Sequence, residues 1–245
     1  MHSEIKKRIY KVPISSFVAN KSTPVISFGN FERAKIGTLG INPSSREFFS
    51  KNSLLIPSMK RLVDLESLGI QSYDQLDEAM AQEILNGCYN YFNLRPLEWF
   101  CEFEDLLNTA NFSYRNGTAS HIDLVQWSTF PKWSAIPVAE QKKLLESDRG
   151  FFNWQFENND MEMVILGGRQ VLEQVKVISG ISLNSVGHFF YKSGSRNTSV
   201  ELLTMNNFKG KKLVGWSVNL QVMKASIEEK NRVIQVIRKF LQNEL

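Results

Sequence analysis

The sequence predicts an α/β protein, with a three-layer α/β/α fold built on a central, mostly parallel four-stranded sheet and carrying a small β-hairpin. Four short apolar runs occur along the chain, and polar or glycine-containing loops and helical patterns follow them. The chain has 245 residues, of which 42% are hydrophobic, so it can bury a substantial core. Its composition shows no break long enough to be a linker, so we expect a single domain over residues 1–245.

Charge and cysteine content exclude several classes of protein. Lysine and arginine number 29 against 25 acidic residues, giving a net charge of +4 and a pI near 9.0, which suits a polyanionic partner without requiring one. With only Cys88 and Cys101, a disulfide framework is not expected, and a four-thiolate iron–sulfur cluster is excluded. No apolar segment is long enough to span a bilayer, so we expect a soluble, cytoplasmic protein without a membrane partner.

The first 32 residues give weak indications of structure, with possible edge strands at Tyr10 to Pro13 and Pro24 to Phe28. The first central strand is predicted in the stretch Lys35 to Ser45, where a short apolar run with two glycines stops at Asn42-Pro43. Pro43 cannot continue a ladder and restricts Asn42 to extended geometry. Because open α/β sheets bind ligands at the carboxyl edge of their strands, we expect Asn42 to lie in a ligand site.

Gly40-Ile41-Asn42-Pro43 resembles the first catalytic motif of the uracil-DNA glycosylase superfamily, in the form used by its mismatch-specific and thymine-DNA glycosylase branch. The family motif continues with glycine, where this chain has Ser44. The resemblance implies a DNA glycosylase that rotates its target nucleotide out of the duplex and leaves an abasic site. In that mechanism Asn42 is the catalytic residue and holds the attacking water. No metal or organic cofactor is expected, and the partner is DNA bound by a monomer.

Helices and aromatic residues follow the motif. Pro57 to Leu68 has helical spacing, and Ser72 to Gln75 forms a capping box that opens another helix. A third helix is predicted from Pro96 onward. The segment between them, Tyr91 to Phe100, is rich in aromatic residues, which helical spacing assigns mainly to the core; Tyr91, Asn93 and Arg95 are weaker candidates for a pocket.

The second central strand is predicted at His121 to Gln126. Asp123 lies within this apolar run, and a carboxylate is costly to bury without hydrogen bonds, so it is either structural or functional. Gln126 and Ser128, near the end of the strand, could make paired contacts with a base edge. The residues that the resemblance and these arguments assign to substrate binding are Gly40, Ile41, Pro43, Ser44, Phe48, Phe49, Asp123, Gln126 and Ser128.

The third strand is predicted at Met161 to Arg169, after a polar helix from Val138 to Asp148, and it runs into Gly167-Gly168 and a helix. A strand followed by glycines and a helix is also the arrangement found in phosphate-binding loops. The chain has neither Gly-x-Gly-x-x-Gly nor Gly-Lys-Ser, so a nucleotide cofactor is not expected. His2, His121 and His188 are not spaced as metal ligands.

The C-terminal part is predicted to form a hairpin, the fourth strand and a last helix. Ser185 to Tyr191 and Ser199 to Met205 flank a basic loop, Lys211 to Ser217 is the fourth strand, and Ser226 caps the helix. The loop at residues 216–221 occupies the position of the family's second motif, usually His-Pro-Ser or Asn-Pro-Ser followed by a leucine. Ser217 would bind a phosphate and Leu220 would fill the gap left by the extruded base. The expected DNA contacts are Ser217, Asn219, Leu220, Lys192 and Arg196, with Lys211 and Lys212 added by their charge.

The resemblance leaves the target base open. A uracil pocket in this family uses an asparagine on the second strand and a histidine in the second motif, and this chain has neither at those places. We therefore expect a modified base, such as a modified cytosine in phage DNA in an antiviral defence. Uracil or mismatch repair, a non-catalytic nucleic-acid-binding module, and a small-molecule hydrolase using Asp123 or His121 are the alternatives.

Overall fold

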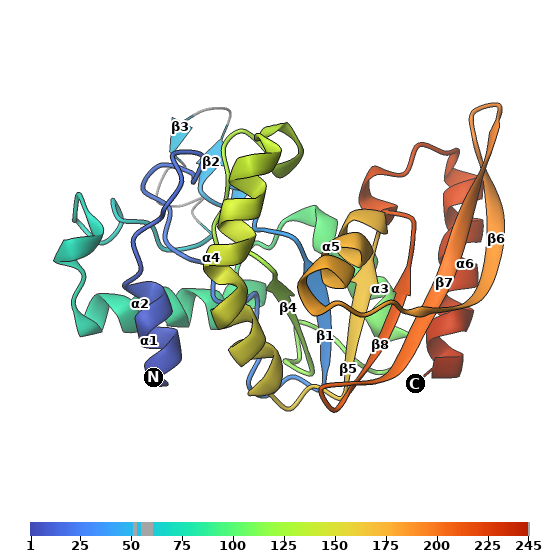
Figure 1. The fold of residues 1–245 in the computed structure, drawn as a ribbon, viewed down its shortest axis with the longest axis horizontal. Coiled ribbons are helices and arrows are strands. Elements are labelled where there is room, and N and C mark those ends of the chain that lie inside the picture. The colour runs from blue at the N-terminus through green and yellow to red at the C-terminus, as the bar shows by residue number, and fades with distance from the viewer. Residues whose placement is uncertain (51–52, 55–60, 245) are drawn as a thin grey trace. The chain divides into compact units, whose positions relative to one another are not determined.

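The computed structural model describes residues 1–50, 53–54 and 61–244 and shows an α/β fold with a six-stranded mixed sheet (Figure 1). The predicted α/β class is confirmed. The chain folds into two compact units, each formed by three separate segments: unit 1 comprises residues 1–32, 41–96 and 121–159, and unit 2 comprises residues 33–40, 97–120 and 160–245. The expectation of a single domain stays a prediction.

The predicted four-stranded, mostly parallel sheet is wrong in its strand count. The observed order is β4-β1-β5-β8-β7-β6, in which β1, β5 and β8 pair in parallel and β8, β7 and β6 pair antiparallel. The predicted separate hairpin is therefore part of the sheet, because the 13 residues of β7 are enough to bond β6 along one edge and β8 along the other. The strands are β1 (Ile36–Gly40), β4 (Ala119–Asp123), β5 (Met163–Gly167), β6 (Asn184–Ser193), β7 (Arg196–Phe208) and β8 (Lys211–Trp216).

In unit 2, helices cover both faces of the sheet. Gly167 of β5 and Trp216 of β8 are paired and share one face, where Phe103 of α3 (Cys101–Asn108) lies 6.0 Å from the Trp216 ring, centroid to centroid. Gly215 projects to the opposite face, where an added Cβ would lie 2.9 Å from Leu172 of α5 (Arg169–Ser179). The last helix, α6 (Ile227–Glu244), buries the apolar stripe expected from its sequence: Val233, Ile237, Phe240 and Leu241.

Unit 1 contains three α-helices among its described residues and is held by a buried polar network. Arg8 donates to the carboxylate of Asp148 at 2.8 Å and to Gln126 Oε1 at 3.2 Å, and all three side chains are buried. Because charged groups are costly to bury alone, Arg8 and Asp148 have to stay paired, and their contact connects α1 (Ser3–Ile9) to α4 (Val138–Glu157). The remaining helix is α2 (Glu78–Tyr89).

Short elements connect these parts. The capping box at Ser72 and Gln75 is confirmed, but it opens a 3-10 turn, and α2 begins after Asp77, whose carboxylate accepts from Met80 N. The two-stranded sheet of β2 (Phe49–Ser50) and β3 (Ser53–Leu54) is separate from the main sheet. The 3-10 helices are η1 (Ser45–Glu47), η3 (Tyr73–Gln75), η4 (Tyr91–Asn93), η5 (Glu98–Phe100), η6 (Trp133–Ala135) and η7 (Leu220–Val222).

Two predictions for unit 1 are wrong. Residues 57–60 of the helix predicted at Pro57 to Leu68 lie outside the described residues. Residues 61–64 are irregular, with an isolated bridge at Asp64, and residues 65–68 form a turn instead of a helix. The cause is local: Asp64 Oδ1 accepts from Ser67 N at 2.7 Å, which offers the backbone an alternative to helical bonds. The edge strands expected at Tyr10 to Pro13 and Pro24 to Phe28 are irregular, apart from an isolated bridge between Phe28 and His121.

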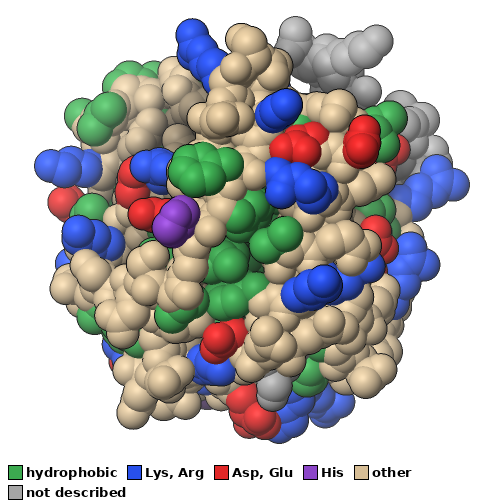
Figure 2. Space-filling view, turned by 90° about the vertical axis from the view of Figure 1, so that its right-hand side faces the viewer, with side chains coloured by type: hydrophobic (Ala, Val, Ile, Leu, Met, Phe, Trp, Pro, Cys, Tyr) green, Lys and Arg blue, Asp and Glu red, His purple; other side chains and the backbone are tan. Residues whose placement is uncertain are grey.

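The surface near β6 and α6 carries charges of both signs. Figure 2 looks onto this face and shows hydrophobic side chains gathered near its middle, with lysine and arginine around them and acidic side chains in between. Such a mixed surface does not by itself indicate a polyanion-binding face. Among the described residues, no helix is both long and apolar enough to cross a membrane.

Candidate active site after the first strand

The side chain of Asn42 is held by three acceptors directly after β1. Its Nδ2 lies 3.1 Å from the Pro43 backbone oxygen, 3.2 Å from the Trp127 backbone oxygen and 3.2 Å from Thr129 Oγ1. The backbone of Val125 donates to the Ile41 oxygen at 2.9 Å, which brings the segment after β4 beside the motif. The stiff placement expected for Asn42 at a strand end therefore has a structural cause.

This arrangement defines which way the Asn42 amide points. Two of the three partners are backbone carbonyls, which only accept hydrogen bonds, so the NH₂ group must face them. The Oδ1 atom then points away from them, and among the described residues it accepts no hydrogen bond. Asn42 is only partly buried, so Oδ1 is a fixed acceptor that a water molecule can reach.

The rest of the motif shapes the turn. Pro43 is buried, whereas Gly40, Ile41 and Ser44 are partly exposed. Ser44 has φ −68° and ψ 141°, a conformation open to any residue, so the glycine usual in the family is not required here. Its Oγ accepts from Arg46 N at 3.2 Å and caps η1.

Glu47, at the end of η1, is a buried carboxyl group that the sequence did not single out. Tyr91 Oη donates to both of its oxygens at 2.9 Å, and both residues are fully buried. Burial, with a smaller contribution from the negative charge of Asp123, raises the pKa of Glu47 to about 8. The hydrogen bond from Tyr91 and the charges of Arg61 and Arg46 act in the opposite direction. Glu47 is therefore largely protonated at neutral pH.

Asp123 is the second carboxyl group of this cluster. It is 4% exposed at the end of β4, and its Oδ1 lies 3.4 Å from Nε2 of His121, which is also buried. The His121 ring contacts Phe28, which in turn meets the Tyr91 ring edge-on with 4.6 Å between centroids. Together, Glu47, Tyr91, His121 and Asp123 form a buried acid–base cluster in the same unit as Asn42.

The predicted aromatic contacts are divided between core and surface. Phe48 is 1% exposed and belongs to the core. Phe49 is partly exposed and lies 6.3 Å from Phe130, centroid to centroid, and Phe130 is 51% exposed. This pair of rings, and not Phe48, is available for stacking on a base. Of the weaker candidates, Tyr91 joins the buried cluster, whereas Asn93 and Arg95 are exposed.

Gln126 and Ser128 differ in what they can still bind. The Gln126 amide is used at both ends, since its Oε1 accepts from Arg8 and its Nε2 donates to the Asp123 backbone oxygen at 2.7 Å. It therefore has a structural role in this conformation. Ser128 is fully buried, and its Oγ has no hydrogen-bond partner among the described residues.

The expected DNA-binding residues of the last loop and hairpin lie in unit 2. Ser217 Oγ accepts from Glu201 N at 2.9 Å, and Asn219 is exposed and caps η7. Leu220, expected to wedge into the duplex, is 2% exposed and packed in the core. In this conformation it cannot fill the gap of an extruded base.

The basic residues also differ in whether their side chains are free to reach a phosphate. Lys192 and Arg196 are exposed on the β6–β7 hairpin, so their charges can reach a phosphate. Lys211 is buried with its Nζ on the Met161 oxygen at 2.9 Å, and burial lowers its pKa. Lys212 pairs with Glu244 at 2.9 Å. The last two therefore have structural partners already.

Within the described ranges, no three His, Cys, Asp or Glu side chains are grouped so that they could hold a metal ion. The sequence could have indicated Glu47, because a glutamate directly before Phe48-Phe49 in an apolar surrounding is unusual, but its burial depends on Tyr91, 44 positions away. Comparison with known family models and with curated proteins finds no significant match to this chain.

Proposed function

We propose that this chain is a DNA glycosylase that hydrolyses the N-glycosidic bond of an extruded base and leaves an abasic site. The observation that carries the proposal is the orientation of Asn42, whose NH₂ group is fixed by Pro43, Trp127 and Thr129 and whose Oδ1 is left to accept a hydrogen bond from water. A neutral amide holds a nucleophilic water without needing to deprotonate it. That suits a reaction in which positive charge develops on the sugar before water adds.

The proposed reaction divides the work between Asn42 and the buried carboxyl cluster. The bond between C1′ of the sugar and the base nitrogen breaks, and its electron pair leaves with the base. Glu47, protonated at neutral pH, is the candidate donor of a proton to the departing base, and this role requires the bound base to open the cluster that buries Glu47 in this structure. The water held by Asn42 adds to C1′ and loses a proton, which returns the carboxyl group to its starting state through solvent.

The proposed substrate is a modified base, for example a modified cytosine. Cytosine-type bases are poorer leaving groups than uracil, so a proton donor such as Glu47 contributes more to their release. The buried polar side chains of Asp123 and Ser128, which this proposal places beside the base, also differ in their hydrogen-bonding groups from the asparagine and histidine pair typical of a uracil pocket. A role in defence against phage with modified DNA rests on analogy with the family.

In this proposal a monomer acts on duplex DNA in the cytoplasm, and exposed hairpin residues contribute phosphate contacts. Flipping the nucleotide costs a few kcal/mol, less for a modified or mismatched base. The partly exposed ring of Phe49 lies near the motif in the sequence, and the exposed ring of Phe130 lies in the segment after β4. Both rings are candidates for stacking on the extruded base.

The experiment that tests the function is an abasic-site assay. Purified protein is incubated with duplex oligonucleotides that carry single modified bases, and alkali-labile breaks are counted with wild type and with Asn42→Ala. Breaks that need Asn42 support the proposal. DNA binding without breaks on every substrate would favour a non-catalytic nucleic-acid-binding module, and neither binding nor breaks would favour a small-molecule hydrolase using His121 and Asp123.

A further inference from the structure

A cavity of about 320 Å³ lies in unit 2, and none of the residues that line it belongs to the Asn42 site. Three segments surround it: the start of α5, the strands of the β6–β7 hairpin, and residues 217–224 after β8. Tyr191 and Thr198 are paired across the hairpin and project to the same face, which places both on the cavity.

The charge of the cavity has one sign. Arg169 and Lys224 line it, and no acidic residue is among its lining residues. In the part of the chain that the structure describes, neither side chain has an ion pair or a hydrogen bond. Other cations of unit 2 do have ion pairs, as Lys230 has with Glu102. Two unpaired cations on one cavity favour an anion.

Hydroxyl groups supply the remaining polar surface. Ser193, Thr198, Ser199 and Ser217 all line the cavity. The Ser217 oxygen already accepts from Glu201 N, so its O–H is left to donate. Hydroxyl donors and cations without carboxylate acceptors suit a group that has only acceptor oxygens, which is the chemistry of phosphate.

The backbone at the start of α5 adds to this preference. Gly168, with φ 102°, donates to the Trp216 oxygen at 2.8 Å, and Arg169 N donates to the Ser217 oxygen at 3.0 Å. These bonds fix the first turn of an 11-residue helix at the cavity. The positive end of the helix dipole therefore lies where the two cations lie.

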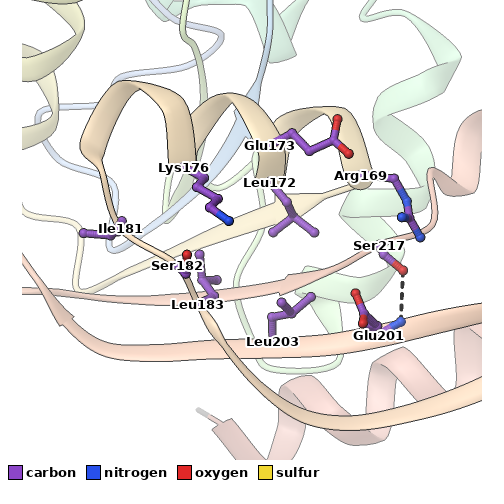
Figure 3. Close-up of a pocket in the computed structure, with 10 residues that line it drawn as sticks. All are labelled: Arg169, Leu172, Glu173, Lys176, Ile181, Ser182, Leu183, Glu201, Leu203 and Ser217. Carbon is purple, nitrogen blue, oxygen red and sulfur yellow. Dashed lines mark hydrogen bonds between the residues drawn. The ribbon is translucent and has the colours of Figure 1, made fainter.

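A second cavity of about 230 Å³ adjoins the first and shares Arg169 and Ser217 with it. Figure 3 shows Leu172 and Leu203 in its middle, with Arg169 and Ser217 at one end and Lys176 and Leu183 toward the other. The carboxylates of Glu173 and Glu201 also line this second cavity, on the side of Arg169 and Ser217. A cavity lined by cations beside a partly apolar one matches a ligand whose phosphate is attached to a less polar group.

We propose that Arg169, Lys224 and the hydroxyls of Ser193, Thr198 and Ser199 join Ser217, for which the resemblance already implies a phosphate contact, in a binding site for a phosphate group, and that the adjoining cavity takes the group attached to it. The phosphate can come from a free nucleotide or from a nucleic-acid strand, since both present the same acceptor oxygens. The site does not depend on base release by Asn42, and it stands if the proposed glycosylase activity fails.

The test is binding of phosphate probes to the full chain by isothermal titration calorimetry. The probes are inorganic phosphate, a nucleoside 5′-monophosphate, the matching nucleoside, and a short single-stranded oligonucleotide without a terminal phosphate. We expect the monophosphate to bind at least about tenfold more tightly than the nucleoside, because charged hydrogen bonds contribute this much each. Tight binding of the oligonucleotide would assign the site to a strand, and preference for the monophosphate would assign it to a nucleotide.

The matched variants are Arg169→Gln with Lys224→Gln, and, as a control with the same charge change, Arg33→Gln with Lys142→Gln, whose side chains are exposed and lie outside both cavities. We expect the first pair to lose at least about tenfold in affinity for every phosphate probe and the control to lose little. Equal losses in the two pairs, or no phosphate binding by wild type, would overturn the proposal. If the first pair does not fold, Lys224→Gln alone serves, because Lys224 lies outside any helix or strand.

Discussion

The side-chain amide of Asn42 donates to the backbone oxygen of Trp127 at 3.2 Å, which joins the segment after β1 to the segment after β4. Trp127 is fully buried, so this acceptor is fixed. The orientation of the candidate catalytic amide is thus determined by the core of unit 1.

We predict that Asn42→Ala abolishes base release and leaves the melting temperature within a few degrees of wild type. The partly buried side chain makes three hydrogen bonds of 3.1–3.2 Å, and water can replace part of them in the variant, so we expect a loss of roughly 1 kcal/mol, which is about 2–4 °C for a chain of this size. Abasic-site counts and thermal unfolding are measured together, with the exposed Asn206→Ala as control. Full activity in Asn42→Ala, or a variant that does not fold, would show that the assignment is wrong.

We predict that Glu47 makes the protein less stable as pH rises. The pKa of Glu47 is about 8 in the fold and 4.5 in the unfolded chain. Below pH 4.5 both states hold the proton; between 4.5 and 8 the folded state alone holds it, so the free energy of unfolding falls by up to about 1.4 kcal/mol for each pH unit. Urea unfolding from pH 5 to pH 8 measures this slope.

Glu47→Gln should flatten this pH dependence, because the amide keeps an acceptor for Tyr91 and cannot ionise. The exposed Glu83→Gln is the control and should keep the wild-type slope. Identical slopes in wild type and Glu47→Gln would contradict the raised pKa. If Glu47 is also the proton donor, Glu47→Gln loses base release at every pH.

We predict that Asp148→Asn destabilises the protein by about 3–5 kcal/mol, because it leaves the buried charge of Arg8 without its partner. The matched control is Asp160→Asn, whose carboxylate is 65% exposed and 3.9 Å from Lys35, and which should change stability by about 1 kcal/mol or less. Chemical denaturation measures both. A decrease in the free energy of unfolding below about 1 kcal/mol in Asp148→Asn would mean that the buried network does not need the charge of Asp148.

We predict that DNA binding weakens with salt, and that Lys192 and Arg196 contribute to that dependence. Each phosphate contact removed should lower the slope of log affinity against log salt by about 0.9. Lys192→Gln and Arg196→Gln are compared with Lys142→Gln on α4, which should keep the wild-type slope. An affinity that does not change between low and physiological salt would argue against contacts with the DNA backbone.

We predict that uracil is not the fastest base released. Release is compared among oligonucleotides with uracil, with thymine opposite guanine, and with hydroxymethylated or glucosylated cytosine, together with modified phage DNA. A base that leaves buried polar groups unpaired is disfavoured by about 1–3 kcal/mol for each group, which corresponds to a rate lower by about 5- to 150-fold. Uracil as the best substrate would refute this prediction.

Local sequence signals predicted much of the sheet. The strand ending at Asn42, the Gly167-Gly168 turn before α5 and the apolar stripe of α6 all follow from short-range patterns, and each is present. The pairing of β7 with β8 was missed because antiparallel addition to a sheet edge depends on contacts distant in the sequence.

The site was predicted less completely for the same reason. Asn42 is marked by its own neighbours in the sequence, whereas the burial of Glu47 depends on Tyr91 and that of Gln126 on Arg8. Leu220 was expected to be exposed and to insert into the duplex, because of its place in the motif. In the structure its side chain is buried in the hydrophobic core. Partners from distant segments decide whether a polar group is structural or available to a ligand.

The pairing of β1 with β5 has a consequence for synthesis of the protein. Ile36 pairs with Met163, roughly 130 positions later in the chain, so a ribosome needs about 6–25 s to add the residues between them. During that time β1 has left the ribosome without its neighbour β5, and its apolar residues are exposed to other chains. Slow translation at low temperature or an early chaperone contact should therefore affect the yield of this protein more than that of a protein whose central strands are made consecutively.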